Sequence, residues 1–189
     1  MEKEKARRIV QRKIARLTKK ERSEKAKAIE KRLFALHEFQ KGQVIMFFVG
    51  MADEVDTRNM VARALNVGKT VALPRTYIKS GSLRAFEIKS LVELVPGTYG
   101  ILEPPETLPI APASIDFIVV PARAYDRRGN RLGRGKGFYD RFLAEKNLTA
   151  VRCGVAFDCQ IFSHLAHSQF DEPVDIIITE SEVIRCKNM

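Results

Sequence analysis

The stretch IDFIVVPARAYDRRGNRLGRGKGFYDRFLAEKN, residues 115–147, carries the pattern from which the fold is predicted. It begins with IDFIVVPA (115–122), a continuous apolar run of the kind found in strands buried on both faces. It ends with YDRFLAEKN (139–147), which is predicted to be a helix. Between them lies GNRLGRGKGFYD (129–140), in which three glycines alternate with two cations. A strand, a glycine-rich connection and a helix in this order indicate an α/β protein.

Strands and helices are predicted to alternate over most of the chain. The other expected strands are 44–49, 70–74, 83–88, 151–157 and 174–180. A helix is predicted within 54–69, with a cap at Asp56 or Thr57 and a stop at Gly68. The proline-rich segment 96–112 is predicted to be a surface loop without regular structure. The pattern favours a mostly parallel central sheet with helices on both faces.

Two helices are predicted at the N-terminus. Apolar residues recur every three or four positions, first at Ala6, Val10, Ile14 and Leu17 and then at Ala26, Ile29, Leu33 and Leu36. Between the two sets, TKKE (18–21) has the spacing of a capping box, with Thr18 as N-cap and Glu21 reaching back. Lys3 and Arg7 are four residues apart, so their side chains leave the first helix on the same side.

The positive charge of the chain is concentrated in this helical pair. Residues 1–32 hold 14 Lys or Arg and five Glu, a net charge of +9 out of +10 for the whole chain. Three interpretations stay open: solvated helices rich in Lys and Glu, an electropositive patch that attracts a small anionic ligand, and a nucleic-acid-binding surface.

Length, hydropathy and cysteine usage narrow the class of protein. A chain of 189 residues suits one domain, which we place at 1–189. No apolar run approaches the roughly 20 residues that a membrane helix needs, and the charged N-terminus does not resemble a secretory signal. The three cysteines, Cys153, Cys159 and Cys186, form no CxxC pair. We expect them to be packed apolar residues in a reducing, cytoplasmic protein.

The glycine stretch has the composition of an anion-binding loop. Its alternating glycines are Gly133, Gly135 and Gly137, and its cations are Arg134 and Lys136. Glycine amides can approach an anion closely, and ligands of open α/β sheets bind beyond the carboxyl ends of the strands. Asp140 follows, where a carboxylate could hold Mg²⁺ beside phosphate oxygens. These residues favour a phosphate cradle, with a flexible surface loop as the alternative.

Two familiar phosphate motifs do not match. A Walker A loop has Ser or Thr after its lysine, but Gly137 follows Lys136. The dinucleotide-binding fingerprint GxGxxG has a third glycine where this chain has Phe138. The stretch therefore belongs to another kind of site.

GNRLGRGKGFYD resembles the signature of the 5-formyltetrahydrofolate cyclo-ligase family, also called 5,10-methenyltetrahydrofolate synthetases. FVGMADEVDT (48–57) resembles the folate-contacting loop of that family, and Lys3 and Arg7 match a basic pair on its first helix. The segments ALPR (72–75), GILEP (100–104) and VDIIIT (174–179) occur in the family order. The resemblance covers most of the chain, and the glycine signature is its most specific part.

The resemblance implies an ATP- and Mg²⁺-dependent ring closure. ATP would phosphorylate the formyl oxygen of 5-formyltetrahydrofolate, giving an iminium phosphate. The neighbouring folate amine would then attack the activated carbon, and phosphate would leave with 5,10-methenyltetrahydrofolate as the product. The protein would position the reactants and stabilise charge on the transferred phosphoryl group.

The resemblance also implies roles for individual residues. Arg134 and Lys136 would be catalytic. The expected ATP contacts are Lys3, Arg7, Arg131, Leu132, Gly133, Arg134, Gly135, Lys136, Gly137, Phe138 and Tyr139. The expected folate contacts are Val49, Glu54, Arg134, Gly135, Lys136, Gly137 and Phe138, and the expected Mg²⁺ ligands are Asp140 and Asp175.

Some positions depart from the family pattern or match none of it. Phe138 stands where relatives often have Tyr, and Tyr125 where Phe is common, which we interpret as a packing change. His164 and His167 have HxxH spacing without other metal ligands, so we expect them to be structural or exposed.

Two other functions compete with the cyclo-ligase interpretation. One is a basic protein that binds nucleic acid through its N-terminus and glycine loop. The other is a related ATP-dependent kinase or ligase acting on another small substrate. We favour a monomeric enzyme that binds ATP and a folate, without nucleic-acid or membrane partners.

Overall fold

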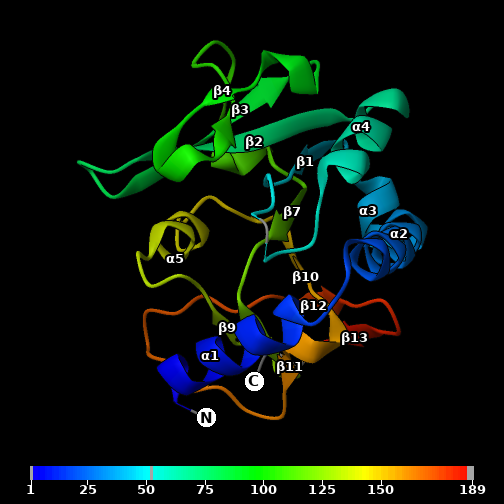
Figure 1. Cartoon of the computed structure of the whole chain (residues 1–189). Coiled ribbons are helices and arrows are strands. Elements are labelled where there is room, and N and C mark those ends of the chain that lie inside the picture. The colour runs from blue at the N-terminus through cyan, green and yellow to red at the C-terminus, as the bar shows by residue number, and fades with distance from the viewer. Residues whose placement is uncertain (1, 52, 187–189) are drawn as a thin grey trace.

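The computed structural model describes residues 2–51 and 53–186, so the ends of the predicted domain and Ala52 in the predicted folate loop lie outside the described residues. Its centre is an eight-stranded sheet (Figure 1). The strands, in spatial order, are β13 (Val183–Arg185), β12 (Ile176–Ile178), β10 (Val151–Val155), β7 (Phe117–Val120), β1 (Val44–Met46), β2 (Thr70–Tyr77), β3 (Ser82–Ile88) and β6 (Pro109–Ile110). The five strands from β12 to β2 are parallel, and the outer strands are antiparallel. The prediction of a mostly parallel sheet is confirmed.

Helices cover both faces of the sheet, as predicted, but unequally. The helices are α1 (Lys3–Ala15), α2 (Lys19–Ala35), α3 (His37–Lys41), α4 (Arg58–Asn66) and α5 (Phe138–Leu143). Apolar residues of α1 to α4 belong to one core cluster, and those of α5 belong to a second cluster across the sheet. The predicted N-terminal pair is α1 and α2. No helix in the described part of the chain is both long enough and apolar enough to cross a membrane.

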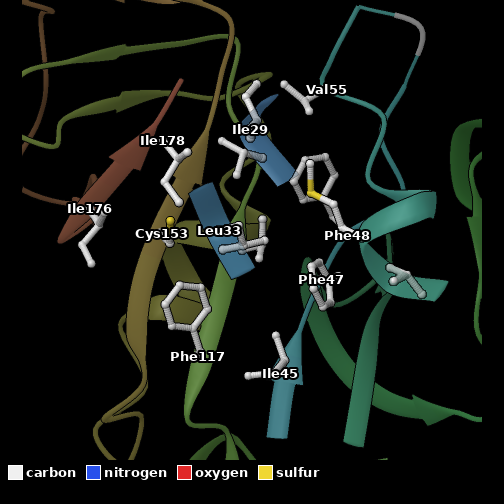
Figure 2. Packing of buried hydrophobic residues seen from close by; sticks show 14 of the residues in the cluster. Ile29, Leu33, Ile45, Phe47, Phe48, Val55, Phe117, Cys153, Ile176 and Ile178 are labelled. Carbon is white, nitrogen blue, oxygen red and sulfur yellow. The ribbon is translucent and has the colours of Figure 1, made fainter. Parts of the chain in front are cut away.

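The two core clusters arise from strict alternation along the central strands. In β1 and the residue after it, Ile45 and Phe47 face the first cluster, whereas Met46 faces the second. Figure 2 shows Ile45, Phe47 and Phe117 with Leu33 of α2 and Cys153 of β10 in the first cluster. Continuous apolar runs were therefore the correct sign of strands buried on both faces.

Several local predictions are confirmed. The Thr18 hydroxyl accepts the Glu21 amide, and the Glu21 carboxylate accepts the Thr18 amide, which completes the capping box. Thr57 is the N-cap position of α4, and Gly68 follows its end with a φ of +80°. Tyr125 is fully buried, and its hydroxyl donates to the Val120 carbonyl at 2.5 Å.

The expected side-chain environments of the histidines and cysteines also agree with the structure. His164 and His167 are exposed. All three cysteines are free; Cys153 is buried, and the other two are half-buried. The interpretation of these residues as exposed or packed groups is confirmed.

The prediction that 96–112 lacks regular structure is wrong in part. The segment contributes to a short hairpin of β4 (Val95–Pro96) with β5 (Leu102–Glu103), and it supplies β6 to the main sheet. Two of its five prolines, Pro96 and Pro109, lie in short edge strands, where a missing N–H costs little. Glu103 is buried and accepts the Thr76 amide at 3.2 Å, which fixes the hairpin on β2.

A second, three-stranded sheet was not predicted. It consists of β11 (Ile161–Phe162), β8 (Ala124–Asp126) and β9 (Arg131–Leu132), so the glycine stretch contains a strand as well as a loop. The buried carboxylate of Asp126 organises the β8–β9 turn by accepting the amides of Arg128 and Asn130. These elements are too short to show a hydrophobic period.

We predict that Gly129→Ala destabilises the protein. Gly129 has a φ of +93°, and a Cβ there would lie 2.2 Å from the Val174 carbonyl oxygen. Strain and steric overlap together should lower the free energy of unfolding by about 2 kcal/mol or more. Gly68→Ala is the matched control, because Gly68 has a similar φ and no atom within 4 Å of its added Cβ. Urea unfolding of both variants measures the difference, and equal losses would contradict the steric argument.

Candidate active site

A cavity of about 210 Å³ lies where the chain leaves the carboxyl ends of β1 and β7. Its apolar lining residues include Phe48, Val49, Met51, Leu83, Ile101 and Phe138. Six cations also line it, namely Lys3, Arg7, Arg123, Arg131, Arg134 and Lys136. Such a cavity suits a ligand with a flat apolar part and several negative charges.

The structure brings nearly all of the predicted site residues to this cavity. Every residue from Arg131 to Asp140 lines it, together with Lys3 and Arg7 of α1 and with Val49 and Glu54 of the loop after β1. Asp175, by contrast, lies just before β12 and outside the lining. Its carboxylate accepts the Arg152 amide at 2.8 Å.

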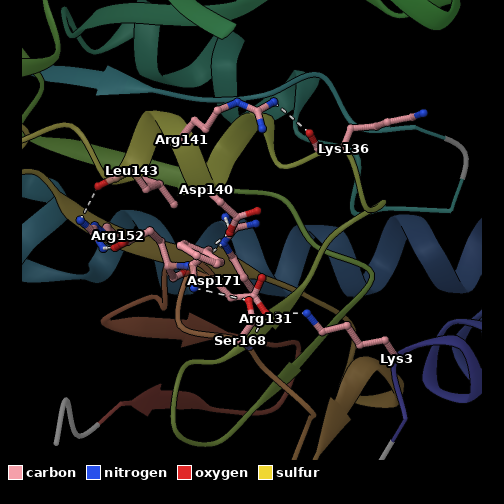
Figure 3. A network of polar contacts seen from close by, with 11 residues as sticks. Lys3, Arg131, Lys136, Asp140, Arg141, Leu143, Arg152, Ser168 and Asp171 are labelled. Atoms are coloured by element: carbon pink, nitrogen blue, oxygen red, sulfur yellow. Dashed lines mark hydrogen bonds and ion pairs between the residues drawn. The ribbon is translucent and has the colours of Figure 1, made fainter. Parts of the chain in front are cut away.

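An ion pair closes the base of the glycine loop, Gly133–Gly137. Arg131 precedes the loop and Asp140 follows it, and Arg131 Nη2 lies 2.6 Å from Asp140 Oδ1 (Figure 3). The Arg131 side chain is only 3% exposed, and its Nε donates to the Glu172 carbonyl at 3.0 Å. The Glu172 amide in turn donates to Asp140 at 3.2 Å. The two ends of the loop are thus fixed to each other and to the segment before β12.

Helix α1 holds the glycine loop from a second direction. Arg7 donates to the Gly133 carbonyl through Nε at 3.2 Å and Nη2 at 3.1 Å. Lys3 forms an ion pair of 2.6 Å with Asp171, which also lines the cavity. Burial alone would raise the pKa of Asp171, but hydrogen bonds from Lys3 and Ser168 hold it below its usual value.

Arg134 connects the glycine loop to the loop after β1. Its Nη2 lies 2.5 Å from Asp53 Oδ1 and 3.1 Å from Glu54 Oε1. The other Glu54 oxygen accepts the Met51 amide at 2.9 Å, so the carboxylate is held in place. Arg134, predicted to contact both ATP and folate, is therefore in direct contact with Glu54, predicted to contact folate alone.

The Lys136 side chain is available to a ligand. Its backbone carbonyl accepts Arg141 Nη2 at 2.9 Å, whereas its exposed side chain extends away from the loop in Figure 3. Among residues 2–51 and 53–186, Nζ has no hydrogen-bond or ion-pair partner. Gly135 and Gly137 flank it with φ values of +91° and +69°, conformations that favour glycine.

Tyr139 places a buried hydroxyl at the cavity. The hydroxyl oxygen has no hydrogen-bond partner in the described part of the chain. Burial raises the pKa of Tyr139, and the charge of Glu54 raises it further against the opposing effect of Arg131. The group is therefore a neutral donor at physiological pH, and a bound ligand could accept its proton in a hydrogen bond.

The described residues contain no group of three His, Cys, Asp or Glu side chains close enough to hold a metal ion. Asp140 lines the cavity, but its Oδ1 is already bound by Arg131 and by the Glu172 amide. The metal role of Asp140 and Asp175 stays a prediction.

Sequence reasoning missed several residues that line or organise the cavity, among them Asp53, Tyr99, Arg123 and Asp171. Tyr99 has a φ of +59°, which is unusual for a residue with a side chain, and it lies in the segment predicted to be irregular. Asp53 is adjacent in sequence to Glu54, a predicted folate contact, so its position could have indicated a place at the site. Arg123 and Asp171 belong to no motif, and only the folded chain brings them to the site.

The fold and cavity define an α/β protein with a glycine-lined, cationic site for an anionic ligand. A model of the 5-formyltetrahydrofolate cyclo-ligase family matches residues 1–180, and the chain belongs to that family.

Known proteins of similar sequence and structure carry the same family name. The chain is 28% identical to 5-formyltetrahydrofolate cyclo-ligase of Mus musculus, over 87% of this chain and 86% of that protein. It is also 28% identical to the Escherichia coli K12 enzyme, over 88% and 94%. The structure of Aquifex aeolicus 5,10-methenyltetrahydrofolate synthetase superimposes with a TM-score of 0.86 at 33% identity, over 99% of this chain and 94% of that one.

We predict that Asp140→Asn destabilises the fold, because it leaves the Arg131 guanidinium buried without its counter-ion. The free energy of unfolding should fall by about 3 kcal/mol. The matched control is Asp171→Asn, whose partner Lys3 is 38% exposed and screened by water, so we expect a loss of about 1 kcal/mol or less. Chemical denaturation measures both, and an Asp140→Asn loss no larger than that of the control would contradict the role of the ion pair.

Proposed function

We propose that the protein is a 5-formyltetrahydrofolate cyclo-ligase that uses ATP and Mg²⁺. The formyl oxygen attacks the γ-phosphorus of ATP, and ADP leaves. The neighbouring secondary amine of the folate then attacks the activated formyl carbon and loses its proton. Cleavage of the carbon–oxygen bond releases phosphate and leaves 5,10-methenyltetrahydrofolate. Phosphorylation is needed because a formamide is a poor electrophile with no good leaving group.

The contact between Arg134 and Glu54 is the observation that carries this proposal. It joins the glycine loop, which has the family signature, to the loop that resembles the folate-contacting segment. A phosphoryl donor on the first loop and a folate on the second would meet within one cavity. Proximity of two bound reactants is the main contribution a protein can make to such a transfer.

The residues of the cavity fit the phosphates of ATP. Gly135 and Gly137 have positive φ values, and between them Lys136 has an ammonium group without a partner among the described residues. Arg134 and Lys136 would stabilise the charge of the transferred phosphoryl group, while Lys3 and Arg7 would contact ATP from α1.

The apolar lining of the cavity fits the other reactant. Val49 and Phe138 belong to it, and Glu54 also lines the cavity with a side chain that is only 8% exposed. A buried carboxylate is a strong acceptor for the N–H groups of a pterin ring. We therefore assign Glu54 to folate recognition, with Val49 and Phe138 packing against the ring system.

Mg²⁺ would neutralise negative charge on the ATP phosphates. Asp140 is the proposed protein ligand, since Arg131 and the Glu172 amide both bind its Oδ1, and Oδ2 has no hydrogen bond within residues 2–51 and 53–186. The assignment of Asp175 to the same ion rests on the family resemblance and stays a prediction, as do the monomeric state and the cytoplasmic location.

A test of the proposal is product formation from 5-formyltetrahydrofolate, ATP and Mg²⁺, followed by the near-ultraviolet absorbance of the methenyl product. We expect ATP-dependent turnover by the unmodified protein. Lys136→Ala should lower kcat about 100-fold, because it removes a cation from the developing charge. Lys146→Ala is the control, since Lys146 is an exposed lysine outside the cavity.

No turnover by the unmodified protein, with ATP still bound, would redirect the proposal to a related ligase or kinase with another substrate. Turnover that Lys136→Ala and Lys146→Ala affect equally would contradict the role of the glycine loop.

A further inference from the structure

Arg123 is a cavity residue to which neither the glycine signature nor the family-derived roles assign a task. It follows β7, and its side chain is only 13% exposed. Its backbone is fixed on both sides, because the Arg123 amide donates to the Leu132 carbonyl at 2.8 Å and its carbonyl accepts Gln160 Nε2 at 3.0 Å. The guanidinium is therefore presented to the cavity from a rigid position.

A single carboxylate is shared between two arginines at this point. Asp53 pairs with Arg123, and the same side chain lies 2.5 Å from Arg134 Nη2. Arg134 has Glu54 as a second partner, whereas Arg123 has Asp53 alone among the described residues. The pair joins the end of β7 to the loop after β1 and to the glycine loop.

Around Arg123 the positively charged side chains outnumber the negatively charged ones. Burial lowers the pKa of Arg123, and the nearby guanidinium groups of Arg134 and Arg7 lower it further. Arg7 itself is bound by a neutral carbonyl, that of Gly133, rather than by a carboxylate. Three guanidinium groups thus face two carboxylates, Asp53 and Glu54, and an additional anion would relieve their repulsion.

We propose that Arg123 is a further phosphate-binding residue of the site, and that Asp53 is an internal anion which the ATP phosphates displace from it. The proposal rests on the proposed function, which supplies ATP as the ligand. A guanidinium forms paired hydrogen bonds with phosphate oxygens as it does with a carboxylate, so Arg123 can exchange one partner for the other without moving its backbone. Its neighbour Arg134 belongs to the glycine loop, and its neighbour Arg7 donates to Gly133 of that loop, so Arg123 lies beside cations that are proposed to bind the phosphates.

If the phosphates displace Asp53, then Arg123 and Asp53 have opposite effects on the affinity for ATP. Arg123 contributes affinity for the phosphates, whereas Asp53 competes with them for Arg123 and Arg134. Loss of the arginine should therefore weaken ATP binding, and neutralisation of the aspartate should strengthen it.

The test is calorimetric titration of the whole protein with Mg·ATP in the absence of folate. We expect Arg123→Gln to raise the dissociation constant of ATP about tenfold or more, and Arg123→Lys to restore part of the affinity. Arg128→Gln is the control, because it removes the same charge from an exposed position outside the cavity. It should change the constant less than twofold. Asp53→Asn should lower the constant severalfold, and thermal unfolding confirms that each variant is folded.

Equal ATP affinities for Arg123→Gln and Arg128→Gln would overturn the proposal. So would a loss of 5-formyltetrahydrofolate affinity in Arg123→Gln with ATP binding unchanged, because it would assign the residue to the folate. Weaker ATP binding by Asp53→Asn would overturn the displacement of Asp53. If the unmodified protein bound folate but no ATP, the proposed function would fail first, and the proposal for Arg123 would fail with it.

Discussion

The ion pair between Arg131 and Asp140 is the contact on which the site depends. It joins the residues before and after the glycine loop, and the loop between them can then adopt positive φ values without unravelling. The same guanidinium donates to Glu172, so the segment before β12 is held against the loop as well. Because Arg131 is almost fully buried, removing its partner Asp140 would strongly lower the stability of the fold. A rigid loop base is what phosphate recognition by backbone amides needs.

The order of the parallel strands determines which other segments lie beside the glycine loop. The carboxyl ends of β1 and β7 lie side by side, so the loop after β1 and Arg123 after β7 enter the same cavity. Helix α1 adds Lys3 and Arg7, which gives part of the N-terminal charge a position at the site. Arg134 then bridges to Asp53 and Glu54. Charged residues that are widely separated in the sequence therefore line one cavity together with apolar side chains.

Local sequence patterns predicted the fold because the central strands are continuous apolar runs and the N-terminal helices have clear apolar periodicity or a capping box. The apolar run at 115–122 and the capping box at Thr18 each have a local physical cause, and both are present. The small sheet with β8 and β9 was missed because its strands have two or three residues each and are fixed by the buried carboxylate of Asp126. The pairing of Arg123 with Asp53 was missed for another reason. It depends on the neighbouring positions of β1 and β7, which no spacing within either segment reveals.

The central claim is that the phosphoryl donor and the folate react directly in this cavity, so the formyl oxygen must become a phosphate oxygen. The most direct test uses 5-formyltetrahydrofolate labelled with ¹⁸O in the formyl group, a single turnover with ATP and Mg²⁺, and mass spectrometry of the phosphate released. The account predicts one ¹⁸O atom in each phosphate, because the carbon–oxygen bond breaks after the phosphorus–oxygen bond has formed. Unlabelled phosphate, with the ¹⁸O recovered in water, would contradict it, since ATP would then be hydrolysed without activating the formyl group.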